Sequence, residues 1–142
     1  MSDFDPVVVV FACDYCAYTA ADVAGRMGLS YPPGVRVLRV PCAGKVEPMY
    51  LMNALQMGAD GVLVAGCQVG DCHFKSGNLR AAARVKRVQE LLEEIGIGGQ
   101  RVAMAHMSAG QGAVFAQAAT EFSQQIAEMG PNPIKQGARR AA

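Results

Sequence analysis

The chain has 142 residues, of which 51% are hydrophobic and 18% charged, and this is typical of one globular domain rather than a disordered or collagen-like protein. A balance of 13 basic and 12 acidic side chains gives a net charge of +1, so nucleic acid is not an expected partner, because its binding depends on clustered positive charge. A membrane helix needs about 18 or more apolar residues in succession, and the sequence has no such run. The acidic start, Met1–Asp5, is unlike a signal peptide, so we expect a cytoplasmic protein without membrane insertion.

The first half of the chain alternates apolar runs with segments that favour helix. Val7–Ala12 is a continuous, mostly β-branched run and predicts a parallel strand that is buried on both faces. Ala17–Met27, rich in alanine, predicts a helix. Val35–Val40 alternates apolar and polar side chains, which predicts a second strand at a less buried edge of the sheet. Glu47–Met57, with a proline in its first turn, predicts the next helix.

The second half repeats the pattern. Gly61–Gly66 predicts a third buried strand, and Leu79–Ile95 carries an apolar stripe that predicts the longest helix. Arg101–Met107 predicts a fourth strand, and a last helix follows over Ser108–Met129. The remaining residues, 131–142, show no apolar periodicity and include three basic side chains, so we expect a disordered basic tail there: Lys135, Arg139 and Arg140.

Four strands that alternate with four helices predict a single α/β domain over residues 1–130. We expect an open, mostly parallel four-stranded sheet with helices on both faces, of the flavodoxin or Rossmann type. In such sheets, binding sites lie beyond the carboxyl ends of the strands. The first strand is not followed by the glycine-rich fingerprint of dinucleotide-binding proteins, so a dinucleotide is not expected here.

The five cysteines fall where such a site would lie: Cys13, Cys16, Cys42, Cys67 and Cys72. Cys13, Cys42 and Cys67 each follow a predicted strand, so the topology brings them to one edge of the sheet. Structural disulfides are unusual in a reducing compartment, which favours metal ligands or redox thiols. Thiolates are soft ligands that suit iron–sulfur clusters and zinc, and four of them complete a [2Fe-2S] cluster.

Other interpretations of the cysteines remain open. Cys13 and Cys16 form a C-x-x-C pair between a strand and a helix, which also fits a thiol-disulfide redox protein, although it leaves the other three unexplained. A zinc-binding assembly module is the other alternative, but four-thiolate zinc sites usually pair two short knuckles. A single cysteine is often a buried core residue, whereas five at strand ends are not expected to be core residues alone.

Three polar residues beside Cys72 are expected to surround the thiolates without binding metal: Asp71, His73 and Lys75. His73 is expected to donate a hydrogen bond toward a cluster sulfur or to face solvent. Arg80 could also complement the negative charge of thiolates. His106, at the end of the fourth predicted strand, is expected to be half-buried near the same edge.

The cysteine segments together resemble a known family. The residues that carry the resemblance are Cys13–Cys16, Arg39–Val46 and above all Gly58–His73, which contains the run Gly-Cys-Gln-Val-Gly-Asp-Cys-His. They are similar to the delta subunit of methyl-viologen-reducing hydrogenase. The likeness continues through Ser76–Asn78 and the long helix to about Gly130, and so covers nearly the whole chain.

The resemblance implies a small, non-catalytic electron-transfer subunit that carries one [2Fe-2S] cluster. It implies partners on two sides: a hydrogenase, a formate dehydrogenase or another oxidoreductase subunit, and the flavin subunit of a heterodisulfide reductase-type complex. The ligands it implies are four of the five cysteines, and we expect the one left out to belong to the pair Cys13 and Cys16. A cluster that exchanges electrons with a partner should lie near an apolar interface, for which we expect Tyr15, Tyr18 and Phe74.

Overall fold

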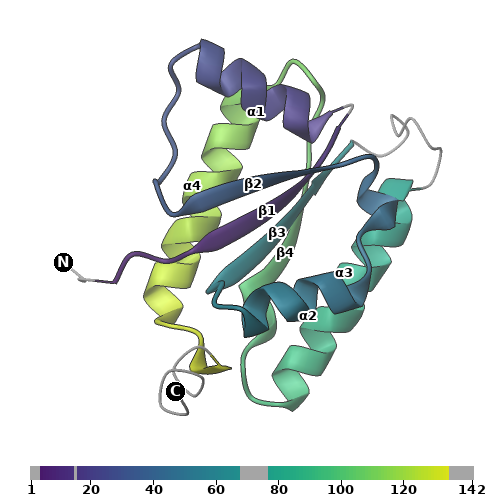
Figure 1. Ribbon diagram of the computed structural model, residues 1–142, viewed down its shortest axis with the longest axis vertical. Coiled ribbons are helices and arrows are strands. Elements are labelled where there is room, and N and C mark those ends of the chain that lie inside the picture. Colours follow the sequence, from purple (N-terminus) through teal and green to yellow (C-terminus); the bar gives the residue numbers. More distant parts are fainter. Residues whose placement is uncertain (1–3, 15, 68–76, 135–142) are drawn as a thin grey trace.

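The computed structural model of the chain describes residues 4–14, 16–67 and 77–134. These residues form a four-stranded sheet in the order β2-β1-β3-β4, in which every neighbouring pair of strands is parallel (Figure 1). The strands are β1 (Val8–Cys13), β2 (Val35–Val40), β3 (Gly61–Gly66) and β4 (Val102–His106). The predicted single α/β domain with a parallel sheet is confirmed.

Burial along the strands follows their place in the sheet. Every residue of β3 is buried, because it lies between β1 and β4 and helices cover both faces. The predicted edge position of β2 is also confirmed, since Arg36, Leu38 and Arg39 are exposed. The central strand β1 aligns Phe11 with Leu38 on one side and with Val64 on the other.

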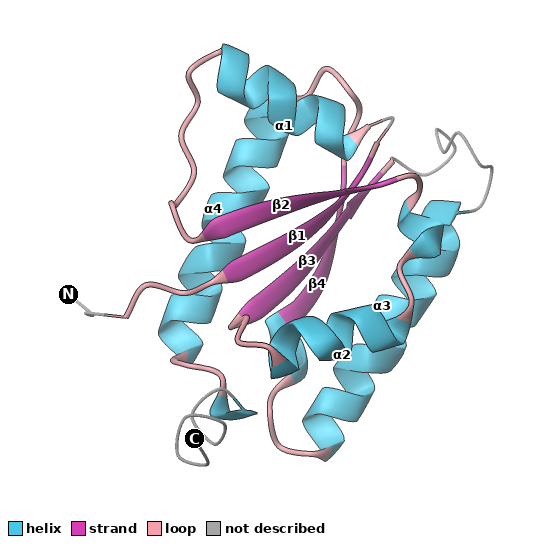
Figure 2. Ribbon diagram, in the orientation of Figure 1, coloured by secondary structure: helices cyan, strands magenta, loops and turns pink. Residues whose placement is uncertain are grey.

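The helices form one layer on each face of the sheet (Figure 2). They are α1 (Ala17–Arg26), α2 (Pro48–Gln56), α3 (Gly77–Glu94) and α4 (Gly112–Met129), with two short 3-10 turns, η1 (Ala43–Lys45) and η2 (Gly99–Arg101). Helices α1 and α4 pack together over one face, and α2 and α3 over the other, so the sheet separates two apolar cores. None of the helices in the described part of the chain has the length and apolar character needed to cross a membrane.

The strand order creates a switch point between β1 and β3. The chain leaves β1 toward α1 on one face and leaves β3 toward α3 on the other (Figure 1). In open α/β sheets, ligands bind at such a point, because the two connections diverge and leave a crevice beyond the carboxyl ends of the strands. Cys13 ends β1 and Cys67 directly follows β3, so two of the predicted site residues lie at this switch point.

Helix α4 starts later than the sequence pattern predicts. Instead of continuing from Ser108, the chain makes a turn in which Ser108 and Gln111 hydrogen-bond each other, with the Ser108 amide 2.7 Å from Gln111 Oε1. The helix then begins at Gly112, where a Cβ atom would lie 2.8 Å from the backbone nitrogen of Ala24 in α1. The close approach of two helices therefore decides where α4 begins.

The expectation of a disordered tail is wrong for residues 131–134. Asn132 is fully buried, its amide nitrogen donates to Asp60 Oδ1 at 3.0 Å, and its side chain donates to the carbonyls of Leu55 and Ala59 at 2.9 Å each. Hydrogen bonds to two backbone carbonyls and one carboxylate hold this segment, and such contacts leave no periodic signal in the sequence. The rest of the predicted tail, with Lys135, Arg139 and Arg140, lies outside the described residues.

Arg101 anchors the same region at the amino end of the sheet. Its guanidinium is almost fully buried, and Nη1 donates to the Asp60 carbonyl at 2.9 Å while Nη2 donates to the carbonyls of Gly130 and Pro131 at 3.0 and 3.2 Å. The Asp60 carboxylate accepts the amide of Val7 at 2.9 Å. Burial lowers the pKa of Arg101, and the negative charge of Asp60 opposes this shift.

Candidate metal centre

Two buried thiols meet at the switch point of the sheet. The Sγ atoms of Cys13 and Cys67 lie 3.7 Å apart, and each residue is only 1% exposed. Two thiolates that bind one tetrahedral metal ion at about 2.3 Å lie about 3.8 Å from each other. The side chains of Cys13 and Cys67 therefore already have the spacing that a shared metal ion requires.

Cys16 lies next to this pair of thiols, at the start of α1. It is the N-cap residue of that helix, is half-buried and interacts with the thiol of Cys67. Burial raises the pKa of the Cys67 thiol far above its ordinary value, and hydrogen bonds and charge repulsion with Cys16 and Cys13 add to the rise. A bound cation has the opposite effect, because it favours the thiolate form of its ligands.

The turn that carries Cys42 packs against the same edge. Cys42 is 3% exposed and precedes η1, where its Sγ accepts a hydrogen bond from the Gly44 amide at 3.4 Å. A Cβ atom on Gly66 would lie 3.2 Å from that of Ala43, and one on Gly44 would lie 2.8 Å from the Gly77 Cα. The Cys42 turn is thus wedged between the end of β3 and the first residue of α3, and only glycine allows the approach at Gly44.

Arg84 ties this turn to α3 and was missed by the sequence analysis. Its Nη1 donates to the carbonyl of Gly44 at 2.6 Å and to that of Val46 at 3.2 Å. In the sequence nothing separates Arg84 from Arg80 and Arg87, which are exposed on the same helix. Only the packing of η1 against α3 shows its role.

The backbone of Cys67 is held from two sides. Its carbonyl accepts a hydrogen bond from Asn78 Nδ2 at 3.0 Å and lies 2.9 Å from Nδ1 of His106, and the neighbouring Gly66 carbonyl accepts from the Met107 amide at 2.9 Å. Because a carbonyl only accepts, Nδ1 of His106 carries its proton. The expected position of His106, half-buried near the cysteine edge, is confirmed. The contact made by Asn78 was not predicted.

The rim of this edge carries an aromatic residue and an ion pair. Tyr18, one of the residues expected at an apolar interface, is 36% exposed, and the guanidinium of Arg39 lies 5.4 Å from the centre of its ring. The Nε atom of Arg39 also lies 3.6 Å from Asp14 Oδ1. The other members of the predicted site and interface lie outside the described residues: Tyr15, Asp71, Cys72, His73, Phe74 and Lys75.

The donor set fits a soft metal centre in its chemistry. Within residues 4–14, 16–67 and 77–134, no three or more His, Cys, Asp or Glu side chains converge on one metal position. The cysteines that are described are all free thiols, and three of them are buried within the protein. Buried thiols at ligand spacing suit iron–sulfur clusters or zinc rather than a hard cation such as calcium. The residues that are present therefore fit a thiolate-bound metal centre.

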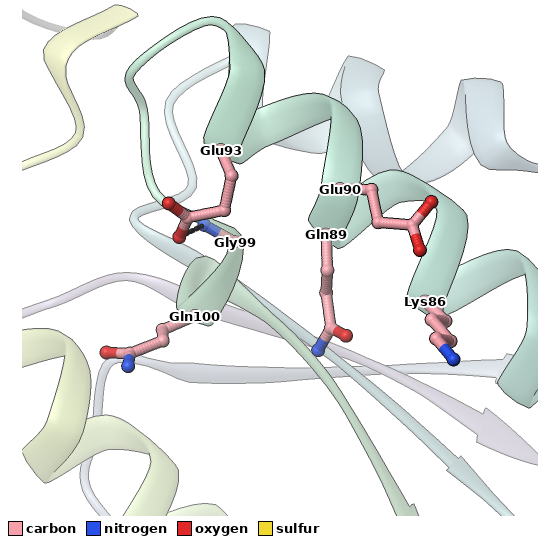
Figure 3. Close-up of a pocket in the computed structure, with 6 residues that line it drawn as sticks. All are labelled: Lys86, Gln89, Glu90, Glu93, Gly99 and Gln100. Carbon is pink, nitrogen blue, oxygen red and sulfur yellow. Dashed lines mark hydrogen bonds between the residues drawn. The ribbon is translucent and has the colours of Figure 1, made fainter.

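Two surface hollows lie away from the cysteines. One, of about 630 Å³, is an apolar groove between β1 and α2, with Leu38 of β2 at its edge, and its lining includes Phe11 and Tyr50. The other, of about 350 Å³, is polar and lies between α3 and η2, where Glu93 Oε1 accepts the Gly99 amide at 2.7 Å (Figure 3). Neither hollow has a cysteine among the described residues that line it.

Fold and site together define a small α/β protein with buried thiols at the switch point of a parallel sheet. Residues 8–130 match the family model of the methyl-viologen-reducing hydrogenase delta subunit, and the chain belongs to this family. The resemblance found in the sequence is thereby confirmed.

Curated relatives cover nearly the whole chain. An iron-sulfur subunit of the F420-non-reducing hydrogenase from Archaeoglobus profundus is 48% identical over 129 residues, which cover 91% of this chain and 94% of the relative. The vhu iron-sulfur subunit of the same type of hydrogenase from Methanocaldococcus jannaschii is 44% identical over 131 residues, which cover 92% and 98%. One subunit of the ferredoxin:CoB-CoM heterodisulfide reductase from Methanosarcina mazei is 40% identical over 126 residues, which cover 89% of this chain but 16% of the relative. The same unit therefore also occurs within a much longer polypeptide.

Proposed function

We propose that the chain is a non-catalytic electron-transfer subunit that holds a [2Fe-2S] cluster at the carboxyl edge of its sheet. The observation that carries the proposal is the buried pair Cys13 and Cys67, whose Sγ atoms lie 3.7 Å apart at the switch point. Relatives that cover almost all of the chain are named iron-sulfur subunits, which supports the same cofactor class.

The proposed ligands are four of the five cysteines, with one of Cys13 and Cys16 left out. When bound, the cluster supplies a one-electron carrier whose potential depends on hydrogen bonds and solvent exposure. Three of these cysteines lie in the protein interior, since Cys13, Cys42 and Cys67 are each 3% exposed or less. We further propose that the polar residues near Cys72 lie around the thiolates, where Lys75 would balance their negative charge: Asp71, His73 and Lys75.

The proposed partners are redox proteins on two sides of the chain. Several relatives are named as subunits of a hydrogenase, which supports a hydrogenase as one partner, and a formate dehydrogenase or another oxidoreductase could take its place. The relatives from heterodisulfide reductases carry this unit in one long chain, which supports a flavin subunit of that type as the other partner. The proposal places the protein in the cytoplasm, where cysteines stay reduced.

A thiol-disulfide function for Cys13 and Cys16 has less support. Attack on a disulfide requires an accessible thiolate, whereas Cys13 is 1% exposed and its thiol lies beside that of Cys67. A zinc-binding assembly module uses the same thiol spacing and is the stronger alternative. Metal analysis and spectroscopy distinguish it from the cluster.

The test is anaerobic purification followed by iron and sulfide analysis and electron paramagnetic resonance after reduction with dithionite. We expect about two irons and two sulfides per chain and a signal from the reduced protein. Single replacements by serine should abolish the signal at Cys67, whereas replacement of the cysteine of the first pair that is not a ligand should preserve it. Zinc in the purified protein, with no signal after cluster reconstitution, would refute the proposal.

A further inference from the structure

We propose that Asn78 and His106 are positioning residues that hold the Cys67 peptide so that its thiolate faces Cys13. The inference rests on the proposed function only in that the thiols bind metal. It assigns the two residues a task that requires neither to be a ligand.

The geometry at Cys67 carries the proposal. The carbonyl oxygen of Cys67 lies just beyond the last residue of β3 and accepts hydrogen bonds from Asn78 Nδ2 at 3.0 Å and His106 Nδ1 at 2.9 Å. One donor comes from the first turn of α3 and the other from the last residue of β4. The preceding carbonyl, of Gly66, accepts from the Met107 amide at 2.9 Å. The consecutive carbonyls of Gly66 and Cys67 are thus fixed by three donors.

Asn78 is itself held in one orientation. It is 1% exposed, and its Oδ1 accepts the amide of Leu79 at 2.9 Å while its Nδ2 donates to the Cys67 carbonyl. An amide group that is bonded at both ends cannot rotate without losing a bond. Asn78 therefore couples the orientation of the Cys67 peptide to the start of α3, against which the Cys42 turn also packs.

The two donors also act electrostatically on the thiols. The Cys67 carbonyl oxygen belongs to the same residue as the thiol, and its partial negative charge disfavours a thiolate nearby, whereas N–H groups bonded to that oxygen offset this effect. Hydrogen bonds to groups next to metal ligands typically change metal affinity by about 10- to 100-fold when removed. Loss of either donor should weaken metal binding and make reduction of a bound cluster less favourable.

The variants separate the donor from the bulk of the side chain. In His106→Asn the side-chain amide can place an N–H close to the position of Nδ1, whereas in His106→Gln the N–H is one carbon farther from the backbone. Asn78→Asp keeps the acceptor for Leu79 but removes the donor to Cys67. The matched control is Gln89→Leu, which removes a donor from the Val102 carbonyl at the other end of β4, where the present distance is 2.6 Å.

The readout is binding of Co²⁺ to the reduced, metal-free full chain, measured by the thiolate-to-cobalt absorption band, together with the midpoint potential of the reconstituted protein. We expect about 10- to 100-fold weaker Co²⁺ binding and a more negative potential for His106→Gln and Asn78→Asp. The Co²⁺ affinity of His106→Asn should lie within a few-fold of that of the wild type. Gln89→Leu should lower the melting temperature without changing Co²⁺ affinity.

The outcomes separate this inference from the proposed function. Equal Co²⁺ affinity in all variants, or an equal loss in Gln89→Leu and His106→Gln, would overturn the positioning role. So would a wild-type protein that shows no thiolate band with Co²⁺. If the wild type binds Co²⁺ through its thiols and the variants bind Co²⁺ more weakly as expected, but no [2Fe-2S] cluster assembles, the inference stands and the proposed function fails. Should Asn78→Asp not fold, the two His106 variants decide the result.

Discussion

Residues at both ends of the sheet are almost fully buried, but different contacts stabilise them. At the amino end, Asp60, Arg101 and Asn132 are at most 3% exposed and hydrogen-bond one another or nearby backbone groups. At the carboxyl end, Cys13 and Cys67 are each 1% exposed and face each other as thiols. Sulfur is a weak hydrogen-bonding atom, so the burial of these two thiol side chains is not matched by polar contacts as strong as those at the amino end.

This difference indicates which end of the sheet has its buried polar groups satisfied without a bound ligand. Every buried side-chain nitrogen or oxygen in the described residues has a hydrogen-bond partner, so the amino end needs no ligand to satisfy its polar groups. At the carboxyl end, burial raises the pKa of the Cys67 thiol, and the neighbouring cysteines raise it further. A metal ion bound there would supply the positive charge that the thiolates need. The amino end therefore has a structural role, and the carboxyl end is suited to bind a soft metal.

The largest effect on stability is expected from Arg101→Met at the amino end. The substitution leaves carbonyls of Asp60, Gly130 and Pro131 without their donor and the charge of Asp60 without its counterpart. Removal of one partner from a buried charged network costs about 3–5 kcal/mol. Urea denaturation should show this loss, while Co²⁺ affinity measured well below the unfolding transition stays unchanged. A variant with wild-type stability would contradict the structural role of this end.

Gly44→Ala tests the carboxyl end directly. The new Cβ would lie 2.8 Å from the Gly77 Cα, so the Cys42 turn must move away from α3. We expect a loss of about 1–3 kcal/mol in the free energy of unfolding and a clear loss of metal binding. The control is Gly25→Ala in α1, where a Cβ meets nothing within 4 Å and alanine should be neutral or stabilising. Full metal binding by Gly44→Ala would show that the position of the Cys42 turn is not critical.

Arg84→Met should have a smaller effect at the same end. It removes the donor to the carbonyls of Gly44 and Val46 but keeps most of the side-chain volume. The expected cost is about 1 kcal/mol, with Co²⁺ binding weakened several-fold, as measured by thermal unfolding and by the cobalt absorption band. Arg87→Met, on the exposed side of α3, serves as the matched control and should change neither quantity. If both variants behave alike, Arg84 does not hold the turn.

The smallest effect is expected for Arg39→Gln at the rim of the cysteine edge. Arg39 and Asp14 have side chains that are 63% and 43% exposed, and their closest charged atoms lie 3.6 Å apart. Such exposed pairs contribute about 0.5 kcal/mol. Thermal unfolding should hardly change, and Co²⁺ affinity should be that of the wild type. A strong loss of Co²⁺ affinity would instead place Arg39 among the residues that act on the thiols.

The parts of the fold that depend on local pattern were predictable. The apolar runs Val7–Ala12 and Gly61–Gly66 and the alternating run Val35–Val40 identified β1, β3 and the exposed edge strand β2 to within a residue. The start of α4 and the anchoring of residues 131–134 were not predictable, because they depend on contacts with Ala24 and Asp60, far away in the chain.

The candidate site, too, could be predicted from the sequence only in part. That the cysteines lie at one edge followed from topology, since parallel strands end at the same side of a sheet. The sequence placed His106 near this edge, but the hydrogen bonds that hold the edge could not be identified in advance, because Asn78, Arg84 and His106 act on backbone carbonyls 11 to 40 positions away. A carbonyl group is present in every residue, so the sequence carries no signal for such contacts.

The sequence by itself therefore determined the α/β class, the strands, the family and the set of thiols available for a metal. It did so because burial on two faces selects β-branched runs and because soft metal chemistry requires cysteine. Only the tertiary structure decided the strand order, which places Cys13 and Cys67 side by side at 3.7 Å, and the hydrogen bonds that hold their loops. Strand order and loop contacts depend on which surfaces pack together, and that packing is a property of the whole chain rather than of any local segment.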